Sequence, residues 1–210
     1  MFGLRVDLLP TDNHILLALP PSLETHPFLP TSPKLIIKIG ETLGGFTIAL
    51  SRVGSMSLCL KMSECSGWVP LSFVQRSLEA VPRHMYLKTA RSVTISIPPT
   101  VPGITWSLWL KNFALATQLS VRALLAKVVL DALMRTNEDS LPICPRLQRI
   151  GFYSVGSGTL PVDSKLITKL FLFRVATGFS LQRVTVMERG VIRDFKSPAW
   201  LDGILGSGIN

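Results

Sequence analysis

Two stretches of the chain decide the predicted fold: Leu147-Gln148-Arg149-Ile150-Gly151-Phe152 and Leu181-Gln182-Arg183-Val184-Thr185-Val186. Each has an apolar residue at its first, fourth and sixth positions, the L-x-x-L-x-L pattern of a turn that leads into a short strand. A strand, a helical segment and a second strand predict one repeat whose two strands are adjacent and parallel. We therefore expect Leu147, Ile150, Leu181 and Val184 to share one core.

The segment between these stretches carries the signals of a capped helix. Asp163 or Ser164 can accept the first backbone hydrogen bonds, and the helix runs to about Ala176. Gly178 lies just beyond the predicted end, where a residue with a left-handed backbone conformation is common. The predicted apolar stripe of this helix consists of Leu166, Leu170 and Phe173.

A more tolerant match to the repeat pattern occurs upstream, at Leu125-x-x-Val128-x-Leu130, and we assign residues 126–130 to a strand. The three matches are 22 and 34 residues apart, so the repeat is irregular, and leucine makes up 33 of the 210 residues. The predicted fold class is α/β, an irregular leucine-rich-repeat-like solenoid of short parallel strands and helices. A doubly wound α/β domain has a similar alternation of strands and helices and stays open as an alternative.

The remaining elements are predicted from apolar alternation and from glycine and proline positions. Strands are expected at residues 35–39, 56–62 and 93–97, and helices at residues 41–50 and 69–78. Residues 106–119 are expected to form a partly apolar loop or strand, and the rest of the stretch to residue 134 a helix.

Proline sets the predicted domain boundaries. Six prolines occur within the first 33 residues and remove backbone donors, so residues 1–31 are predicted to be a proline-rich N-terminal segment that is extended or irregular. Residues 32–198 form the predicted leucine-rich-repeat-like domain. Residues 199–210 are rich in glycine and are predicted to be a flexible tail.

Several short motifs follow one another in the order found in one known family. They are Ser32–Leu35, Ala49–Leu60, Arg83–Leu87, Cys144-Pro145-Arg146-Leu147-Gln148-Arg149-Ile150 and Ser180–Val186. The Cys-Pro segment looks like the C-P-x-L-x-x-L opening of a repeat. Over about residues 30–190 the chain resembles the F-box/leucine-rich-repeat proteins of mushroom-forming fungi, in their repeat region and without a recognisable F-box.

The resemblance implies a protein that binds another protein and catalyses nothing. In such a family the repeats recognise the substrate of an SCF-type ubiquitin ligase, other subunits carry out the transfer, and cullin-ligase subunits are the expected partners. A cytoplasmic or nuclear location would follow.

The residues that point outward from the predicted strands are the candidate partner-binding site. They are Lys127, Gln148, Arg149, Gln182 and Arg183, accompanied by Val129, Gly151 and Thr185. Basic and polar side chains recur in this set, which would suit a partner with an acidic surface.

Charge leaves a second function class open. The net charge is +9, from 22 Lys and Arg against 13 Asp and Glu, and the basic residues are scattered without a run of four. A basic protein that associates with nucleic acid is therefore the alternative to protein binding.

Motifs of catalysis and of metal binding are not recognisable in the sequence. It contains no G-x-x-x-x-G-K-[ST] loop and no G-x-S-x-G elbow, and its three cysteines lack the spacing of a zinc site. We expect no enzyme activity, no cofactor and no metal, although a small α/β enzyme with an unrecognised site is a third possibility. Charged residues interrupt the longest apolar stretch, so we expect no membrane-spanning segment.

Overall fold

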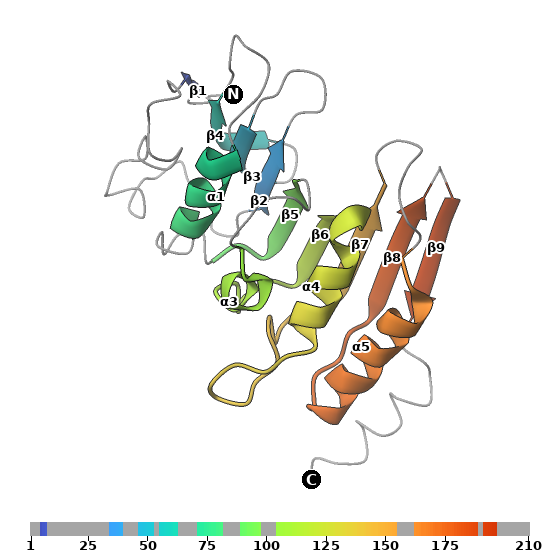
Figure 1. Cartoon of the computed structure of the whole chain (residues 1–210). Coiled ribbons are helices and arrows are strands. Elements are labelled where there is room, and N and C mark those ends of the chain that lie inside the picture. The colour runs from blue at the N-terminus through green and yellow to red at the C-terminus, as the bar shows by residue number, and fades with distance from the viewer. Residues whose placement is uncertain are drawn as a thin grey trace. The chain divides into compact units, whose positions relative to one another are not determined.

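The computed structural model describes residues 5–7, 34–39, 46–52, 55–62, 71–81, 89–97, 104–154, 162–188 and 191–196. The chain divides into two compact units, Met1–Thr105 and Trp106–Asn210. Each unit combines a β-sheet with helices, so the predicted α/β class is confirmed (Figure 1). Most of the terminal segments 1–31 and 199–210 lies outside the described residues, and the predicted domain boundaries stay a prediction.

The first unit contains a five-stranded sheet of order β1-β4-β3-β2-β5. Its elements are β1 (Arg5–Asp7), β2 (Lys34–Ile39), β3 (Phe46–Arg52), β4 (Ser55–Met62), α1 (Leu71–Ala80) and β5 (Ser92–Ser96). Strands β2, β3 and β4 are antiparallel neighbours, whereas β1 pairs with β4 and β5 pairs with β2 in parallel. The buried residues of α1 include Phe73, Val74 and Leu78.

The structure confirms three predicted strands and one predicted helix within two residues at each end. The strands are those at residues 35–39, 56–62 and 93–97, and the helix is that at residues 69–78. The predicted helix at residues 41–50 is wrong, because Phe46–Arg52 form strand β3. Gly44 and Gly45 weaken a helix there, and as a strand this stretch forms ladders with both β2 and β4.

One strand falls in the N-terminal segment, which was predicted to be extended or irregular. Arg5–Asp7 form strand β1, which pairs with Cys59–Lys61 of β4. These residues precede the first proline, Pro10, so all of their backbone N–H groups are available for a ladder. The prolines of this segment lie outside the described residues.

The second unit contains a four-stranded, mostly parallel sheet of order β6-β7-β8-β9. Its elements are α3 (Trp106–Leu110), β6 (Gln118–Arg122), a 3-10 turn (Ala123–Leu125), α4 (Ala126–Leu133), β7 (Arg149–Tyr153), α5 (Ser164–Ala176), β8 (Arg183–Glu188) and β9 (Val191–Lys196). Strands β6, β7 and β8 are parallel, and β9 is antiparallel to β8. Helices α4 and α5 connect the parallel strands and lie on the same face of the sheet (Figure 1).

The core of this unit is built from residues in register across the three parallel strands. Leu119, Ile150 and Val184 are paired neighbours, as are Val121, Phe152 and Val186, and all six are at most 2% exposed. Leu147 and Leu181, which precede β7 and β8, are also buried. The predicted core of residues 147, 150, 181 and 184 on adjacent parallel strands is therefore confirmed.

The third match to the repeat pattern is misplaced. Residues 126–130, predicted as a strand, belong to helix α4, and the strand that pairs with β7 is β6. Burial falls on Ala126, Val129, Leu130 and Leu133, which is helical spacing, whereas Val128 is 42% exposed. The residues equivalent to Leu147, Ile150 and Phe152 are Ala116, Leu119 and Val121, all of them buried.

A repeated hydrogen-bond arrangement precedes each of the two following strands. The N–H groups of Gln148 and Arg149 both donate to the carbonyl of Thr117, at 2.9 and 3.1 Å. The N–H groups of Gln182 and Arg183 both donate in the same way to the carbonyl of Gln148, at 2.8 and 3.2 Å. The chain therefore enters β7 and β8 with the same local geometry.

Helix α5 begins and ends as its sequence predicts. The Asp163 carboxylate accepts from the N–H of Lys165 at 2.8 Å. At the other end Gly178, with φ +78°, donates to the carbonyl of Val175, and Phe179 donates to the carbonyl of Arg174. These two bonds form a Schellman motif, which needs a left-handed residue at the position of Gly178.

The buried stripe of α5 differs from the predicted one. The structure buries Ile167, Leu170, Phe171 and Arg174, whereas Leu166 and Phe173 are only half-buried. The prediction assumed that only apolar side chains face the core, and it therefore omitted the arginine.

Arg174 is the largest fully buried side chain of the described residues, with 1% exposure. Its guanidinium donates to the carbonyl oxygens of Ile143 at 3.1 Å, Cys144 at 3.0 Å, Pro145 at 3.2 Å and Leu147 at 3.3 Å. Burial lowers the pKa of this guanidinium. The cation thus holds the segment that leads into β7 against helix α5, through carbonyl dipoles instead of a carboxylate.

Cys144 lies within this segment in a strained conformation. Its φ is +52°, and its Sγ donates to the carbonyl of Leu110 at 3.3 Å. Burial raises the pKa of its thiol from 9.0 to about 12, and the nearby Arg174 cation opposes this increase. The folded protein therefore keeps this thiol protonated.

Replacing Arg174 with Met keeps most of the side-chain volume but removes the guanidinium hydrogen bonds to four carbonyl oxygens, of which the Cys144 carbonyl keeps a bond from the N–H of Leu147. We expect Arg174→Met to lower the free energy of unfolding by about 3 kcal/mol. The matched control is Lys169→Met, an exposed cation of the same helix, with an expected change of less than about 0.5 kcal/mol. Urea unfolding measures both variants, and equal effects would contradict the anchoring role of Arg174.

The raised pKa of the Cys144 thiol makes stability depend on pH. Between pH 9 and pH 12 the unfolded chain loses this proton and the folded protein keeps it, so the free energy of unfolding falls as the pH rises. We expect the stability difference between the wild type and Cys144→Ala to decrease over this range. Denaturant unfolding at several pH values measures it, and a constant difference would show that the folded thiol titrates normally.

Candidate functional site

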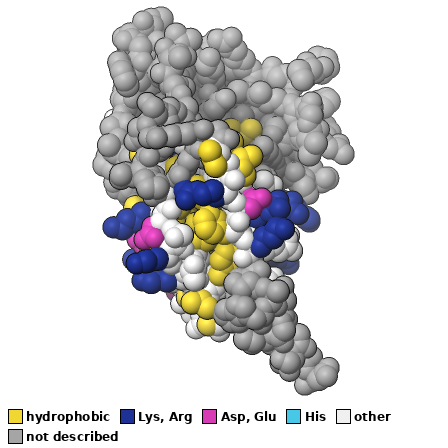
Figure 2. Space-filling view, turned by 90° about the vertical axis from the view of Figure 1, so that its right-hand side faces the viewer, with side chains coloured by type: hydrophobic (Ala, Val, Ile, Leu, Met, Phe, Trp, Pro, Cys, Tyr) yellow, Lys and Arg dark blue, Asp and Glu magenta, His cyan; other side chains and the backbone are white. Residues whose placement is uncertain are grey.

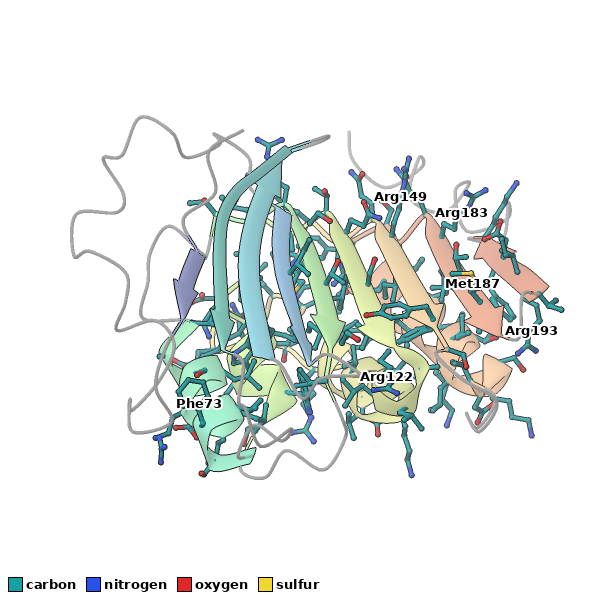
Figure 3. All side chains as sticks on the ribbon, turned by 90° about the horizontal axis from the view of Figure 1, so that it is seen from above. Phe73, Arg122, Arg149, Arg183, Met187 and Arg193 are labelled. Atoms are coloured by element: carbon teal, nitrogen blue, oxygen red, sulfur yellow. The ribbon has the colours of Figure 1, made fainter. Side chains whose placement is uncertain are left out.

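The candidate site is the face of the β6–β9 sheet opposite helices α4 and α5, which we call the open face. Its side chains come from alternate residues: Gln118, Ser120 and Arg122 of β6; Arg149, Gly151 and Tyr153 of β7; Arg183, Thr185 and Met187 of β8; and Ile192, Asp194 and Lys196 of β9. In the described part of the second unit no helix lies against this face (Figure 3). The exposed side chains on it, Arg149, Arg183, Met187, Ile192 and Lys196 among them, can contact a partner directly.

Cations form a row across the open face near the start of the parallel strands. Arg149 pairs with Arg183, and Arg183 pairs with Lys196, so the three lie on neighbouring strands. Figure 3 shows Arg149 and Arg183 side by side on β7 and β8. Neighbouring strands are about 4.8 Å apart, so these like charges repel one another in the unbound protein.

One carboxylate partly neutralises this row. Asp194 forms an ion pair with Arg183, with 3.6 Å between Nη2 and Oδ2. Its other carboxylate oxygen accepts from the hydroxyl of Thr185 at 2.7 Å. Three cations against one carboxylate leave a net charge of +2, and among the described residues Arg149 and Lys196 form no ion pair.

An apolar row runs parallel to the basic row. Tyr153 pairs with Met187, and Met187 pairs with Ile192 of β9. Met187 is 44% exposed and Ile192 is 63% exposed. This surface therefore offers apolar area as well as positive charge. Figure 2, in which the side of the second unit that carries β9 faces the viewer, shows hydrophobic side chains with Lys and Arg on both sides of them.

The middle row allows a close approach to the backbone. Gly151 lies between Ser120 and Thr185, and a Cβ atom added to it would meet the Ser120 Oγ at 3.6 Å, an ordinary contact distance. Without a side chain at this position, the backbone of β7 is accessible between the two hydroxyl groups.

The structure brings four of the five predicted partner-binding residues together. Arg149 and Arg183 lie on the open face, and Gln148 and Gln182 are exposed immediately before them. Gly151 and Thr185 also lie where they were predicted. Whether these residues bind a partner stays a prediction.

Lys127 and Val129 were wrongly placed on a strand. Both belong to helix α4, where Lys127 is exposed and Val129 is buried. The physical reason is the helical burial period of residues 126–133, which a short apolar run does not reveal.

Strand β9 contributes three residues of the open face that the sequence prediction missed. Val191-Ile192-Arg193-Asp194-Phe195-Lys196 has adjacent apolar and adjacent charged residues, so it lacks the alternation of a half-buried strand. One signal was available, because only Arg189 and Gly190 separate β8 from β9, and two residues are the length of a tight hairpin connection.

Two surface hollows occur elsewhere in the second unit. A hollow of about 370 Å³ lies between the starts of α4 and α5, lined by apolar residues with Lys127 and Asp163. Another of about 320 Å³ lies beside α3, where Lys111 and Glu138 form an exposed ion pair at 3.5 Å. Asp163 already caps α5, and neither lining contains a cysteine or histidine nucleophile beside a base.

The described residues contain no group of three His, Cys, Asp or Glu side chains that could hold a metal ion. Among the same residues no helix is long and apolar enough to cross a membrane.

Comparison with known proteins gives no match of this chain to a protein-family model, to a curated protein or to a solved structure. The resemblance to F-box/leucine-rich-repeat proteins therefore depends on the sequence motifs alone.

Proposed function

We propose that the second unit is part of an irregular leucine-rich-repeat-like solenoid and binds an acidic segment of a partner protein on its open face, without catalysis. The observation that carries this proposal is the row of Arg149, Arg183 and Lys196 beside the exposed Met187 and Ile192. A partner with carboxylates and apolar side chains complements both rows.

The repeat interpretation is supported by three equivalent sets of buried residues. Ala116, Leu147 and Leu181 begin them, 31 and 34 residues apart, and the strands that follow are in register. The paired N–H bonds to Thr117 and Gln148 repeat from one set to the next. Recurring contacts between neighbouring repeats are what a solenoid uses to build a continuous core.

The surface suits an acidic protein better than a nucleic acid. Single-stranded nucleic acids bind through stacking on aromatic side chains as well as through charge, and Tyr153 is the one aromatic residue among the described residues of the open face. Exposed ion pairs are worth less than about 1 kcal/mol each. The apolar row would therefore supply much of the affinity, and the cations would select the partner.

A role in substrate recognition for an SCF-type ubiquitin ligase fits this proposal. The resemblance of the repeat motifs supports it, and the cullin-ligase subunits would be the further partners that carry out ubiquitin transfer. A recognisable F-box is absent from the sequence, so a link to these subunits needs a direct test.

Reversal of the basic row tests the proposed surface. We expect the variant with Arg149→Glu and Arg183→Glu to retain less than about one tenth of the partner protein that the wild type retains from an extract of its source cells, because two attractions become repulsions. The matched control, Lys165→Glu with Lys169→Glu, changes the net charge equally on exposed positions of α5 and should retain the partner. Thermal unfolding of both variants verifies their folding.

Quantitative mass spectrometry of the retained proteins distinguishes the functions. Cullin-ligase subunits that depend on the wild-type chain support the ligase role. Ribonucleoproteins that disappear after nuclease treatment support the nucleic-acid alternative, and equal retention by both charge variants contradicts binding at the open face.

A further inference from the structure

The outer edge of the second unit's sheet is strand β9. Among the described strands its neighbour is β8, and the register between them is continuous over six residue pairs, from Arg183–Lys196 to Glu188–Val191. An edge strand presents backbone N–H and C=O groups that can pair with another strand. A regular edge without a bulge is well suited to this pairing.

Apolar side chains at one end of β9 are exposed on both faces of the sheet. Ile192 lies on the open face with 63% exposure, and Val191 lies on the helix side with 61% exposure. Both are β-branched, and such residues favour pairing with similar residues on a neighbouring strand. A strand added to this edge would cover the two side chains.

A second copy of this chain fits the edge poorly. An antiparallel pair of identical strands related by a two-fold axis places one residue opposite its own copy. Two registers of this kind pair five residues of β9 with five residues of the second copy. One places Arg193 opposite Arg193 of the copy, and the other places Asp194 opposite Asp194 of the copy. Like charges directly opposite one another destabilise a strand pair, so the edge disfavours self-association.

The charges at the other end of β9 specify the occupant. Asp194 already accepts from Thr185 and pairs with Arg183. Lys196 is exposed, forms no ion pair with the described residues, and ends the row that contains Arg149 and Arg183. A side chain beside Lys196 on an added strand therefore extends a positively charged row and should be a carboxylate.

We propose that the β9 edge binds an extended segment of an acidic partner by antiparallel strand addition, with a carboxylate opposite Lys196 and β-branched residues opposite Ile192 and Val191. On the added strand, the carboxylate comes four positions before the residue opposite Ile192. Because four is an even number of positions, the side chains of these two partner residues both lie on the open face. This inference goes beyond binding at the open face, because backbone hydrogen bonds at the edge carry the recognition.

A labelled peptide with the central run Glu-Val-Thr-Thr-Val-Val and Gly-Ser at both ends is the probe, and fluorescence anisotropy with the full chain is the measurement. Alternate residues of an added strand direct their N–H groups toward β9, and the others direct them away. Methylation of one alternate set of backbone nitrogens should weaken binding at least tenfold. Methylation of the other set should leave binding within about twofold. Equal affinities for the two methylated peptides, or no binding of the unmodified peptide, would overturn the proposal.

A charge exchange tests the register. Lysine in place of the peptide glutamate should weaken binding about threefold to fivefold, as expected for one exposed ion pair. The variant Lys196→Glu should reverse this preference, whereas Lys169→Glu on α5 should not. A preference that Lys196→Glu leaves unchanged contradicts the proposed register.

Two further measurements separate the edge from other surfaces. Arg149→Glu changes the open face two strands away from β9 and should leave binding of the probe within about twofold. Binding at the edge and binding at the open face can therefore be tested separately. Sedimentation over a range of concentrations should show no dimer that competes with the peptide. Such a dimer would assign the edge to a second copy and overturn the choice of occupant.

Discussion

The guanidinium of Arg174 is the interaction on which the second unit depends. It donates to the backbone carbonyls of Ile143, Cys144, Pro145 and Leu147, and these bonds connect helix α5 with a segment about thirty residues earlier in the chain. An isolated buried cation is unfavourable unless its donors are satisfied. The carbonyl dipoles accept from both terminal nitrogens of the guanidinium, whereas Nε has no partner among the described residues, and these bonds place Leu147 and the start of β7 in the core.

The end of α5 belongs to the same arrangement. The carbonyl of Arg174 accepts from the N–H of Phe179 in the Schellman motif, and the Phe179 ring lies 6.0 Å from the guanidinium carbon. Gly178 allows this turn because it adopts φ +78° without the strain of a side chain. The residue that anchors β7 is therefore also connected to the turn that directs the chain into β8.

The sequence predicted those parts of this unit whose signals are local. Asp163 and Gly178 mark the ends of α5, and Leu147 and Leu181 mark the two parallel strands. The predictions were wrong at residues 41–50 and 126–130, where short apolar runs fit more than one period. Pairing with β2 and β4 makes residues 46–52 a strand, whereas burial at helical spacing makes residues 126–133 a helix. Arg174 was missed because its acceptors are distant in sequence, and an arginine on a helix is usually exposed.

The candidate site was predictable to a similar extent. The L-x-x-L-x-L pattern identified Arg149 and Arg183, because each lies at a position between two of its apolar core residues, Leu147 and Ile150 or Leu181 and Val184. Lys196 and Asp194 could not be assigned to the same surface, since their strand is an exposed edge with no periodic burial. Only pairing with β8 places them beside Arg183.

The carbonyls of Thr117 and Gln148, each of which accepts two N–H groups, have a consequence for binding energetics. They fix the backbone at the residues that carry the first two cations of the open face. A rigid backbone loses little conformational entropy when a ligand is bound, so preorganisation reduces the unfavourable part of association. Most of the entropy lost on binding would then come from the partner and from the ends of the arginine side chains.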